Sequence, residues 1–439
     1  MTYSELKQSQ FSGEYSQVAK PDICWKLLLL AIFFSPLRCY GLFTIGTFTG
    51  SLFKIFSLLM ILFTLIKALT RTYRIYLDMP LKLISLIIFM DIITVVYSNG
   101  MGLFPSYFVS HVILLFGYIV VQNATGKTES LLKAYVYGAI IPGVLGLYQW
   151  ISVMTGRGVP QLPFQQFLVT AGKDDIFLYG NYRVVGTLQD PSYYGLFMAS
   201  VFVICVGLLI TENSTKKRID KVMIALITAL SVFCVFLSGS VTSMVAAVSG
   251  TVFILFFNRN TISRMLKYVF YVGIALVVAL YLMIYVFSYD PLQVLFSKLR
   301  IQAASSSVGS MYGRGAFFSD ALNDFWRSPL WGVGFGNMTR SSGHNSFLTI
   351  LALQGIIGFV LHFLLLIVYP LLGHKTRMIL RRKGLQRSML VVCCAALFGM
   401  VVQVMGYDCL YKMDPSIVII LLVFASIKIG EVVKYDYCE

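Results

Sequence analysis

Long apolar segments separated by short polar ones extend over most of the 439-residue chain. A helix needs about 20 mostly apolar residues to cross the ~30 Å hydrocarbon core of a bilayer, and about twelve segments meet this length. They lie near residues 24–40, 51–69, 81–98, 102–121, 131–151, 191–210, 221–238, 241–257, 266–287, 345–369, 389–406 and 415–430. The pattern predicts an all-α, polytopic transmembrane helical bundle. Because we find no internal repeat and no linker, residues 1–439 are expected to form a single integral membrane domain.

The composition supports a membrane protein and changes how the charge is interpreted. Hydrophobic residues make up 58% of the chain and charged residues only 12%, which excludes an ordinary soluble core. A net charge of +16 would suggest nucleic-acid binding in a soluble protein. Here the lysines and arginines stand in short clusters between apolar segments, as residues that set membrane topology do. We therefore expect no nucleic-acid partner.

The placement of the basic residues predicts the orientation of the bundle. With a cytoplasmic N-terminus, most of the 35 lysines and arginines fall in cytoplasmic segments, and every even-numbered span ends on a basic cluster. Both termini are therefore predicted to be cytoplasmic. The same alternation places two long loops, residues 152–190 and 288–344, on the external face, where we expect the chemistry to take place.

Short helices are predicted in and beside these loops. Apolar residues at helical spacing near residues 162–168 and 292–299 predict helices that lie in the membrane interface. The apolar spacing from Phe318 to Phe325 predicts another short helix that begins just after Arg314. Asp190, followed by a proline, predicts the N-cap of the span that starts at residue 191.

Three arginines near the external face are candidates to bind phosphate: Arg183, Arg314 and Arg340. A guanidinium is always charged and can present two donors to phosphate oxygens. The alternative is that these arginines only anchor helices at the membrane surface, which is the better interpretation for any single one of them. Arg183 and Arg314 stand out because glycine-containing segments precede them, where backbone can approach a ligand closely.

His344 directly precedes the predicted span that starts at residue 345, so its ring is expected near a helix N-terminus. The positive end of the helix dipole disfavours an imidazolium, and a neutral ring can accept a proton from a hydroxyl. A capping or surface role is the alternative interpretation.

Three ionisable residues fall inside predicted spans. Asp91 is expected in the middle of the membrane, where an ionisable side chain is a functional hypothesis by default. A pair with Lys54 or with a hydroxyl of a neighbouring helix is an equal alternative. For His111 and His362 we expect interhelical hydrogen bonds. The sequence contains no cluster with metal-ligand spacing and no phosphate-binding G-x-x-x-x-G-K-[ST] loop, so no metal or cofactor is expected.

Five motifs follow one another in the second half of the chain. They are R-V-V-G-T-L-Q-D-P at 183–191, G-R-G at 313–315, S-P-L-W-G-V-G-F-G-N at 328–337, G-H-N-S-F-L at 343–348 and Q-G-I-I-G-F at 354–359. In order and spacing this series resembles the bacterial O-antigen ligase and O-antigen polymerase (Wzy-type) family of polytopic membrane glycosyltransferases.

The resemblance implies a fold, a reaction and a set of site residues. It implies a GT-C-like bundle and a metal-independent glycosyltransferase without a cofactor, whose donor is a glycan on undecaprenyl diphosphate. Arg183 and Arg314 would contact the diphosphate, and His344 would face the acceptor hydroxyl. Arg340 has no fixed place in the family pattern, but it and Asn345 are further candidates for substrate binding. The glycines of the 328–337 motif are expected to permit a close approach of the backbone.

Within the family we favour a polymerase of O-antigen, capsule or exopolysaccharide on the outer face of the bacterial cytoplasmic (inner) membrane. An O-antigen ligase that transfers the glycan to lipid A core is the alternative. A lipid-glycan flippase or transporter is the rival from another class, but it predicts inverted repeats and ionisable residues along a central path. The implied partners are the undecaprenyl-diphosphate-linked oligosaccharide, membrane lipid, and a chain-length regulator and a flippase of the same pathway.

Overall fold

The computed structural model describes most of the chain. The described residues are 22–37, 41–45, 48–123, 127–158, 160, 177–178, 181–188, 190–210, 218–257, 281, 311–340, 344–380, 385–412 and 414–432. The interface helices predicted near 162–168 and 292–299 lie outside them, as does the predicted span 266–287 apart from Tyr281.

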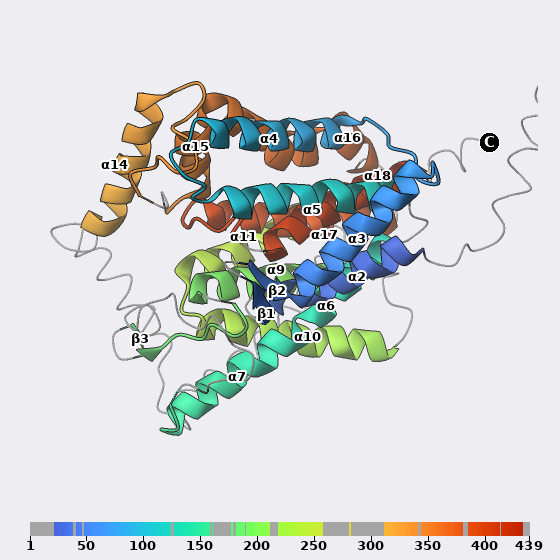
Figure 1. Cartoon of the computed structure of the whole chain (residues 1–439). Helices are drawn as coiled ribbons and strands as arrows, with labels where there is room; N and C mark the ends of the chain where they lie inside the picture. Colours follow the sequence, from blue (N-terminus) through green and yellow to red (C-terminus); the bar gives the residue numbers. More distant parts are fainter. Residues whose placement is uncertain are drawn as a thin grey trace, which may run out of the picture.

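The described residues form a bundle of helices (Figure 1). Within this part of the chain, eight helical segments are long and apolar enough to cross a membrane, which confirms a polytopic helical membrane protein. The helices are α2 (Ile23–Phe34), α3 (Leu52–Leu69), α4 (Met79–Val96), α5 (Phe104–Asn123), α6 (Thr128–Gly138), α7 (Ile140–Met154), α9 (Pro191–Ile210), α10 (Arg218–Leu237), α11 (Val241–Phe257), α14 (Met311–Arg327), α15 (Ser346–Phe363), α16 (His374–Leu380), α17 (Leu385–Val404) and α18 (Asp414–Val432).

Two features depart from the prediction of uniform long spans. In the described part of the predicted span 24–40, helix α2 ends at Phe34 and a 3₁₀ turn (Ser35–Leu37) follows it. Two antiparallel hairpins also interrupt the helices. They pair β1 (Gly41–Ile45) with β2 (Phe48–Ser51), and β3 (Phe177–Leu178) with β4 (Asn181–Tyr182). The first hairpin is rich in β-branched and aromatic residues, which favour strands.

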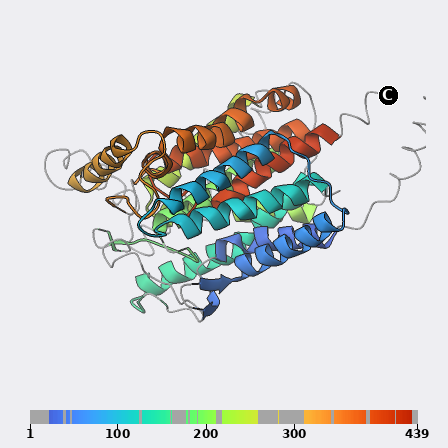
Figure 2. The ribbon, with the colours of Figure 1, turned by 45° about the horizontal axis from the view of Figure 1, so that its top comes forward.

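Helix α9 forms the centre of one half of the bundle. It packs against α10, α11 and α17, and nearly all of its side chains are buried. A helix that is apolar on all sides is expected in such a position. In the other half, α4 and α5 pack side by side, α15 contacts α4, and α18 contacts α5. In both views α14 projects beyond the end of the bundle (Figures 1 and 2).

Helix α15 is broken in its middle, where the sequence predicted one continuous span from 345 to 369. Gly355 has φ 63° and ψ −163°, a conformation outside the helical region. This left-handed φ is one that glycine adopts readily. After Phe363 the chain continues as a π-helical segment (Leu364–Leu372) that contains Pro370, a residue that disturbs regular helical hydrogen bonding. The predicted span is therefore discontinuous.

The segment 328–337, which we call the motif loop, packs into this break. The Val333 N–H donates to the Ala352 carbonyl at 2.8 Å, and the Gly334 N–H donates to the Leu353 carbonyl at 3.0 Å. In return, the Pro329 carbonyl accepts from the Ile356 N–H at 2.8 Å. Backbone groups freed by the break thus find partners within the protein, as the interior of a membrane bundle requires.

The close approach expected of the motif-loop glycines is an approach to other backbone segments. Gly332 has φ 74°, and a Cβ added to it would lie 2.3 Å from the carbonyl carbon of Leu353. A Cβ added to Gly336 would lie 2.4 Å from the carbonyl oxygen of Gly100. These glycines therefore hold the loop against α15 and against the turn between α4 and α5.

Candidate functional site

The predicted site residues gather at one end of the bundle, which we call the site end. Here α4, α10 and α17 finish and α5, α9, α11, α15 and α18 begin. Helix α14 projects from the same end (Figure 1).

Arg183 follows β4 and is fixed against the turn between α10 and α11. Its Nε donates a hydrogen bond to the Ser238 carbonyl at 3.0 Å. The next residue reinforces this position, because the Val184 N–H donates to the Leu237 carbonyl at 3.0 Å. The Arg183 side chain is half-buried. One guanidinium nitrogen thus sets the direction in which the other two point.

Asp190 lies seven residues further on and has two partners. Its Oδ1 accepts from the Ser192 N–H at 2.6 Å, which confirms the predicted cap at the start of α9. Its Oδ2 accepts a hydrogen bond of 2.9 Å from the hydroxyl of Tyr407. The segment that carries Arg183 is thereby joined to the stretch between α17 and α18.

Arg314 lies in the first turn of α14, because that helix begins at Met311. The prediction that the helix begins just after Arg314 is therefore wrong. A glycine inside a helix costs only about 0.5–1 kcal/mol, so Gly313 and Gly315 do not prevent α14 from beginning at Met311. The side chain of Arg314 lies outside the described part of the structure.

His344 immediately precedes α15, as predicted, and two aromatic rings flank it. Its ring centroid is 4.2 Å from that of Phe317 on α14 and 6.0 Å from that of Tyr407. The backbone of His344 has φ 48°, a left-handed conformation that is uncommon for a residue other than glycine. Such conformations cluster at functional sites, where the surrounding structure holds them in place.

Asn345 is the N-cap of α15. Its side-chain oxygen accepts from the N–H groups of Phe347 and Leu348 at 2.9 and 3.1 Å, and its Nδ2 donates to the Met405 carbonyl at 2.7 Å. The amide therefore caps the helix and ties it to the stretch after α17. A role for Asn345 in substrate binding stays a prediction.

Arg340 is held by residues of α14. Its Nε donates to Asp320 at 2.5 Å, and its guanidinium lies over the Phe317 ring at 4.6 Å. This ion pair ties the segment that follows the motif loop to α14, and the guanidinium packs on Phe317, the ring beside His344. A direct role of Arg340 in substrate binding also stays a prediction.

Sequence reasoning missed Tyr407. Burial and the neighbouring Asp190 carboxylate raise the pKa of the Tyr407 hydroxyl well above its usual value, so the group remains a neutral hydrogen-bond donor. Its short polar surroundings, G-Y-D at 406–408, belong to none of the five motifs. Only the folded chain shows its proximity to His344.

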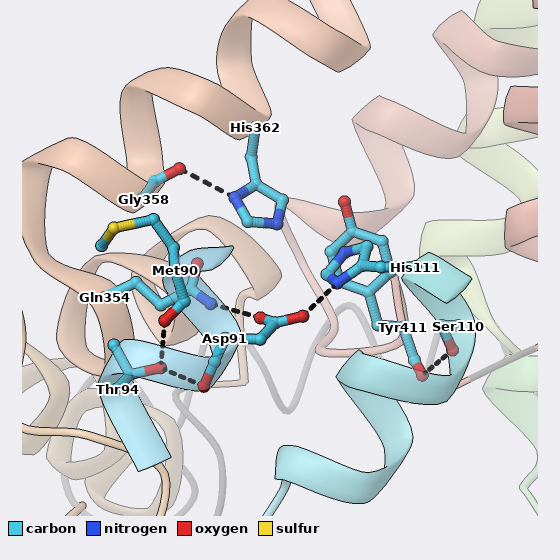
Figure 3. A network of polar contacts seen from close by, with 9 residues as sticks. All are labelled: Met90, Asp91, Thr94, Ser110, His111, Gln354, Gly358, His362 and Tyr411. Carbon is cyan, nitrogen blue, oxygen red and sulfur yellow. Dashed lines mark hydrogen bonds and ion pairs between the residues drawn. The ribbon is translucent and has the colours of Figure 1, made fainter. Parts of the chain in front are cut away.

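A second polar cluster lies deeper in the bundle (Figure 3). Asp91 bonds the Nδ1 of His111 at 2.6 Å and accepts from the Nε2 of Gln354 at 2.6 Å. All three residues are fully buried. Asp91 lies five residues before the end of α4, about 7–8 Å along the helix from that end, and its position in the middle of the membrane stays a prediction.

The two buried histidines behave differently. His111 on α5 makes the expected interhelical bond, with Asp91 on α4. The expectation is wrong for His362, whose Nδ1 pairs with the Gly358 carbonyl of its own helix at 2.7 Å.

The chemistry available at the site end is anion binding and the orientation of hydroxyl groups. It offers the arginine fixed by Ser238, the histidine before a helix N-terminus, and the neutral hydroxyl of Tyr407. Among the described residues, no group of three or more His, Cys, Asp or Glu side chains could hold a metal ion.

Comparison with known proteins identifies the domain that carries most of this site. Residues 226–363 match the family model Wzy_C, described as O-antigen ligase. The match confirms the resemblance, and it contains Arg314, Arg340 and His344. No curated protein matches the chain. Residues 226–363 of this multi-pass membrane protein are therefore similar to the Wzy_C O-antigen ligase domain, whose family members are glycan-transferring enzymes.

Proposed function

We propose that the protein is a polysaccharide polymerase that joins undecaprenyl-diphosphate-linked repeat units of an O-antigen, capsule or exopolysaccharide. The family domain supports glycan transfer in general. The observation that carries the proposal to a specific site is the bond between Asp190 and Tyr407. It brings the arginine-bearing segment 183–190, which lies outside the matched domain, to the side of His344.

Arg183 is the first part of the donor clamp. The bond from its Nε to the Ser238 carbonyl fixes the orientation of the guanidinium, a group that can bind phosphate oxygens with two parallel hydrogen bonds. Negative charge grows on the diphosphate as it leaves. A fixed donor aimed at such charge contributes roughly 3–4 kcal/mol to transition-state stabilisation.

Arg314 is the second part of the clamp. It precedes Phe317 by three residues on α14, and positions three apart share one face of a helix. Phe317 contacts His344. Position 314 is thus one helical turn from a residue of the acceptor side, which supports its assignment to the same site.

His344 acts on the acceptor. The acceptor hydroxyl oxygen attacks C1 of the donor sugar, the bond from C1 to the diphosphate oxygen breaks, and the lipid diphosphate leaves with the bonding electrons. The hydroxyl proton passes to the neutral imidazole of His344. General-base assistance of this kind contributes about 10²–10⁴-fold to the rate.

The orientation and partners follow from the same proposal. The distribution of basic residues supports cytoplasmic termini and a site end on the external face of the bacterial inner membrane. Residues 1–439 act as one GT-C-like membrane domain, with a chain-length regulator and a flippase as pathway partners. Transfer to lipid A core is the second candidate, and the description of the matched family as O-antigen ligase favours it.

Three alanine variants test the site: Arg183→Ala, Arg314→Ala and His344→Ala. Each is expected to abolish long polysaccharide in cells while the amount of protein in the membrane stays unchanged. Arg327→Ala is the matched control, because Arg327 is on α14 as well, its side chain is 62% exposed, and it pairs with Asp324. Polysaccharide of normal length in all three site variants would overturn the assignment.

A further inference from the structure

The deep polar cluster reaches the point at which α15 is broken. Gln354, which donates to Asp91 at 2.6 Å, directly precedes Gly355, the residue with the non-helical backbone. Asp91 comes from α4, and its second oxygen is bonded to His111 of α5. Two neighbouring helices therefore fix the residue before the break (Figure 3).

The glutamine and the two glycines of Q-G-I-I-G make different contacts at the break in α15. Gln354 bonds Asp91. Gly355 lies against the motif loop, since a Cβ added to it would be 2.3 Å from the Leu330 carbonyl oxygen. Gly358 leaves room for the Gln354 side chain, since a Cβ added there would be 2.2 Å from the Gln354 Cβ. The motif thus contains the residue at which α15 is broken, the residue that bonds Asp91, and the glycine that leaves room for the side chain of that residue.

The anchored segment supports both sides of the site end. Ala352 and Leu353, immediately before Gln354, provide the carbonyls that accept from the motif loop. The same half of α15 begins at Ser346 and is capped by Asn345, the residue after His344. A shift at Gln354 would therefore reach the motif loop and His344 together.

We propose that Asp91, held by His111, acts through Gln354 as a positioning residue that fixes the broken α15, the motif loop and His344. A buried carboxylate is costly in a membrane bundle, and apolar residues of similar volume would give equal or better stability. The hydrogen bond that Asp91 accepts from Gln354 gives a reason for a carboxylate at this position. The effect on turnover rests on the proposed function, whereas the effect on the loop does not.

Hydrogen exchange of the purified protein measures the loop directly. In Asp91→Ala and in Gln354→Leu, the amides of residues 330–337 are expected to exchange about tenfold faster or more, because local opening becomes easier. Peptides from α9 should exchange as in the wild type. His362→Leu is the matched control, because His362 lies beside His111 but bonds a carbonyl of its own helix. In this variant the amides of the motif loop should exchange as slowly as in the wild type.

Turnover and a conservative variant complete the test. Asp91→Ala and Gln354→Leu are expected to lower kcat about tenfold or more with little change in KM for the lipid-linked donor, because a small misplacement is costly for the chemical step. Asp91→Asn keeps an oxygen that can accept from Gln354, so it should restore loop protection and most of the turnover.

Four results would overturn the proposal: unchanged exchange in the loop of both variants, equal loosening in His362→Leu, unchanged kcat despite a loosened loop, or Asp91→Asn exchanging like Asp91→Ala. Failure of the proposed function is distinguishable. In that case Arg183→Ala keeps wild-type turnover, while the exchange result still decides whether Asp91 fixes the loop.

Discussion

The Tyr407 hydroxyl donates a hydrogen bond of 2.9 Å to Asp190 and so joins two parts of the chain that no sequence motif links. Asp190 ends the segment that begins with Arg183, and Tyr407 lies beside His344 with ring centroids 6.0 Å apart. The donor and acceptor sides of the proposed site are therefore held together by one partly buried pair.

Replacing Tyr407 by phenylalanine is expected to reduce polymer synthesis about tenfold. The change removes the hydroxyl and leaves the ring beside His344. A hydrogen bond to a charged group contributes about 1.5–3 kcal/mol. The loss is expected near the lower end of this range, because Asp190 keeps its position through its cap on α9. The rate in isolated membranes measures the effect. Tyr148→Phe is the control because Tyr148 is exposed on α7, and equal rates in the two variants would contradict the role of the Tyr407 hydroxyl.

Replacing Arg183 by lysine is expected to lower the rate nearly as much as replacing it by alanine. Arg183 uses Nε for the Ser238 carbonyl and has two further nitrogens in a fixed plane. A lysine ammonium is a point charge that cannot reproduce this fork. Single-turnover rates with a lipid-linked donor would show the difference, and wild-type turnover in Arg183→Lys would argue against a bidentate phosphate contact.

Replacing Gly332 by alanine is expected to destabilise the protein by about 1–3 kcal/mol. The new Cβ would meet the Leu353 backbone at 2.3 Å in a residue with φ 74°. Thermal unfolding in detergent measures the loss. Gly100→Ala is the control, since nothing lies within 4 Å of a Cβ at Gly100. If both variants unfold at the same temperature, the close contact between the motif loop and α15 is wrong.

The surroundings of Tyr97 predict that the stability of the folded protein decreases at alkaline pH. Its hydroxyl donates to the Trp331 carbonyl in the motif loop at 2.7 Å, and burial raises the pKa of Tyr97 to about 12 from an ordinary value of 10.0. The neutral form is thus favoured in the folded protein. This contribution to stability is complete below pH 10 and is lost as the pH rises from there toward 12.

Unfolding temperatures measured between pH 8 and pH 12 test this dependence. The wild type should lose stability more steeply above pH 10 than Tyr97→Phe, which lacks the ionisable hydroxyl. Identical slopes in the two proteins would show that Tyr97 does not hold the motif loop.

Much of the helical layout could be predicted from the sequence, because hydropathy over about 20 residues is a local property. The predicted span 191–210 coincides with α9, and the cap at Asp190 and the position of His344 before a helix are also confirmed. Each of these depends on neighbours in the chain.

The relations that build the site are non-local and could not be read in the same way. The break at Gly355 lies in an apolar segment that hydropathy averages into one span, and it becomes evident only when the motif loop packs against it. The pair of Asp91 and Gln354 joins residues 263 positions apart. Tyr407 had no motif to mark it, so only its contact with Asp190 identified it.

The most direct measurement incubates the purified protein with its lipid-linked repeat unit as the sole substrate and separates the products by size. A ladder of lengthened, lipid-linked glycans is expected, and Arg183→Ala and His344→Ala should abolish it. Product that forms only after lipid A core is added, or movement of the substrate across the bilayer without a new glycosidic bond, would contradict the polymerase.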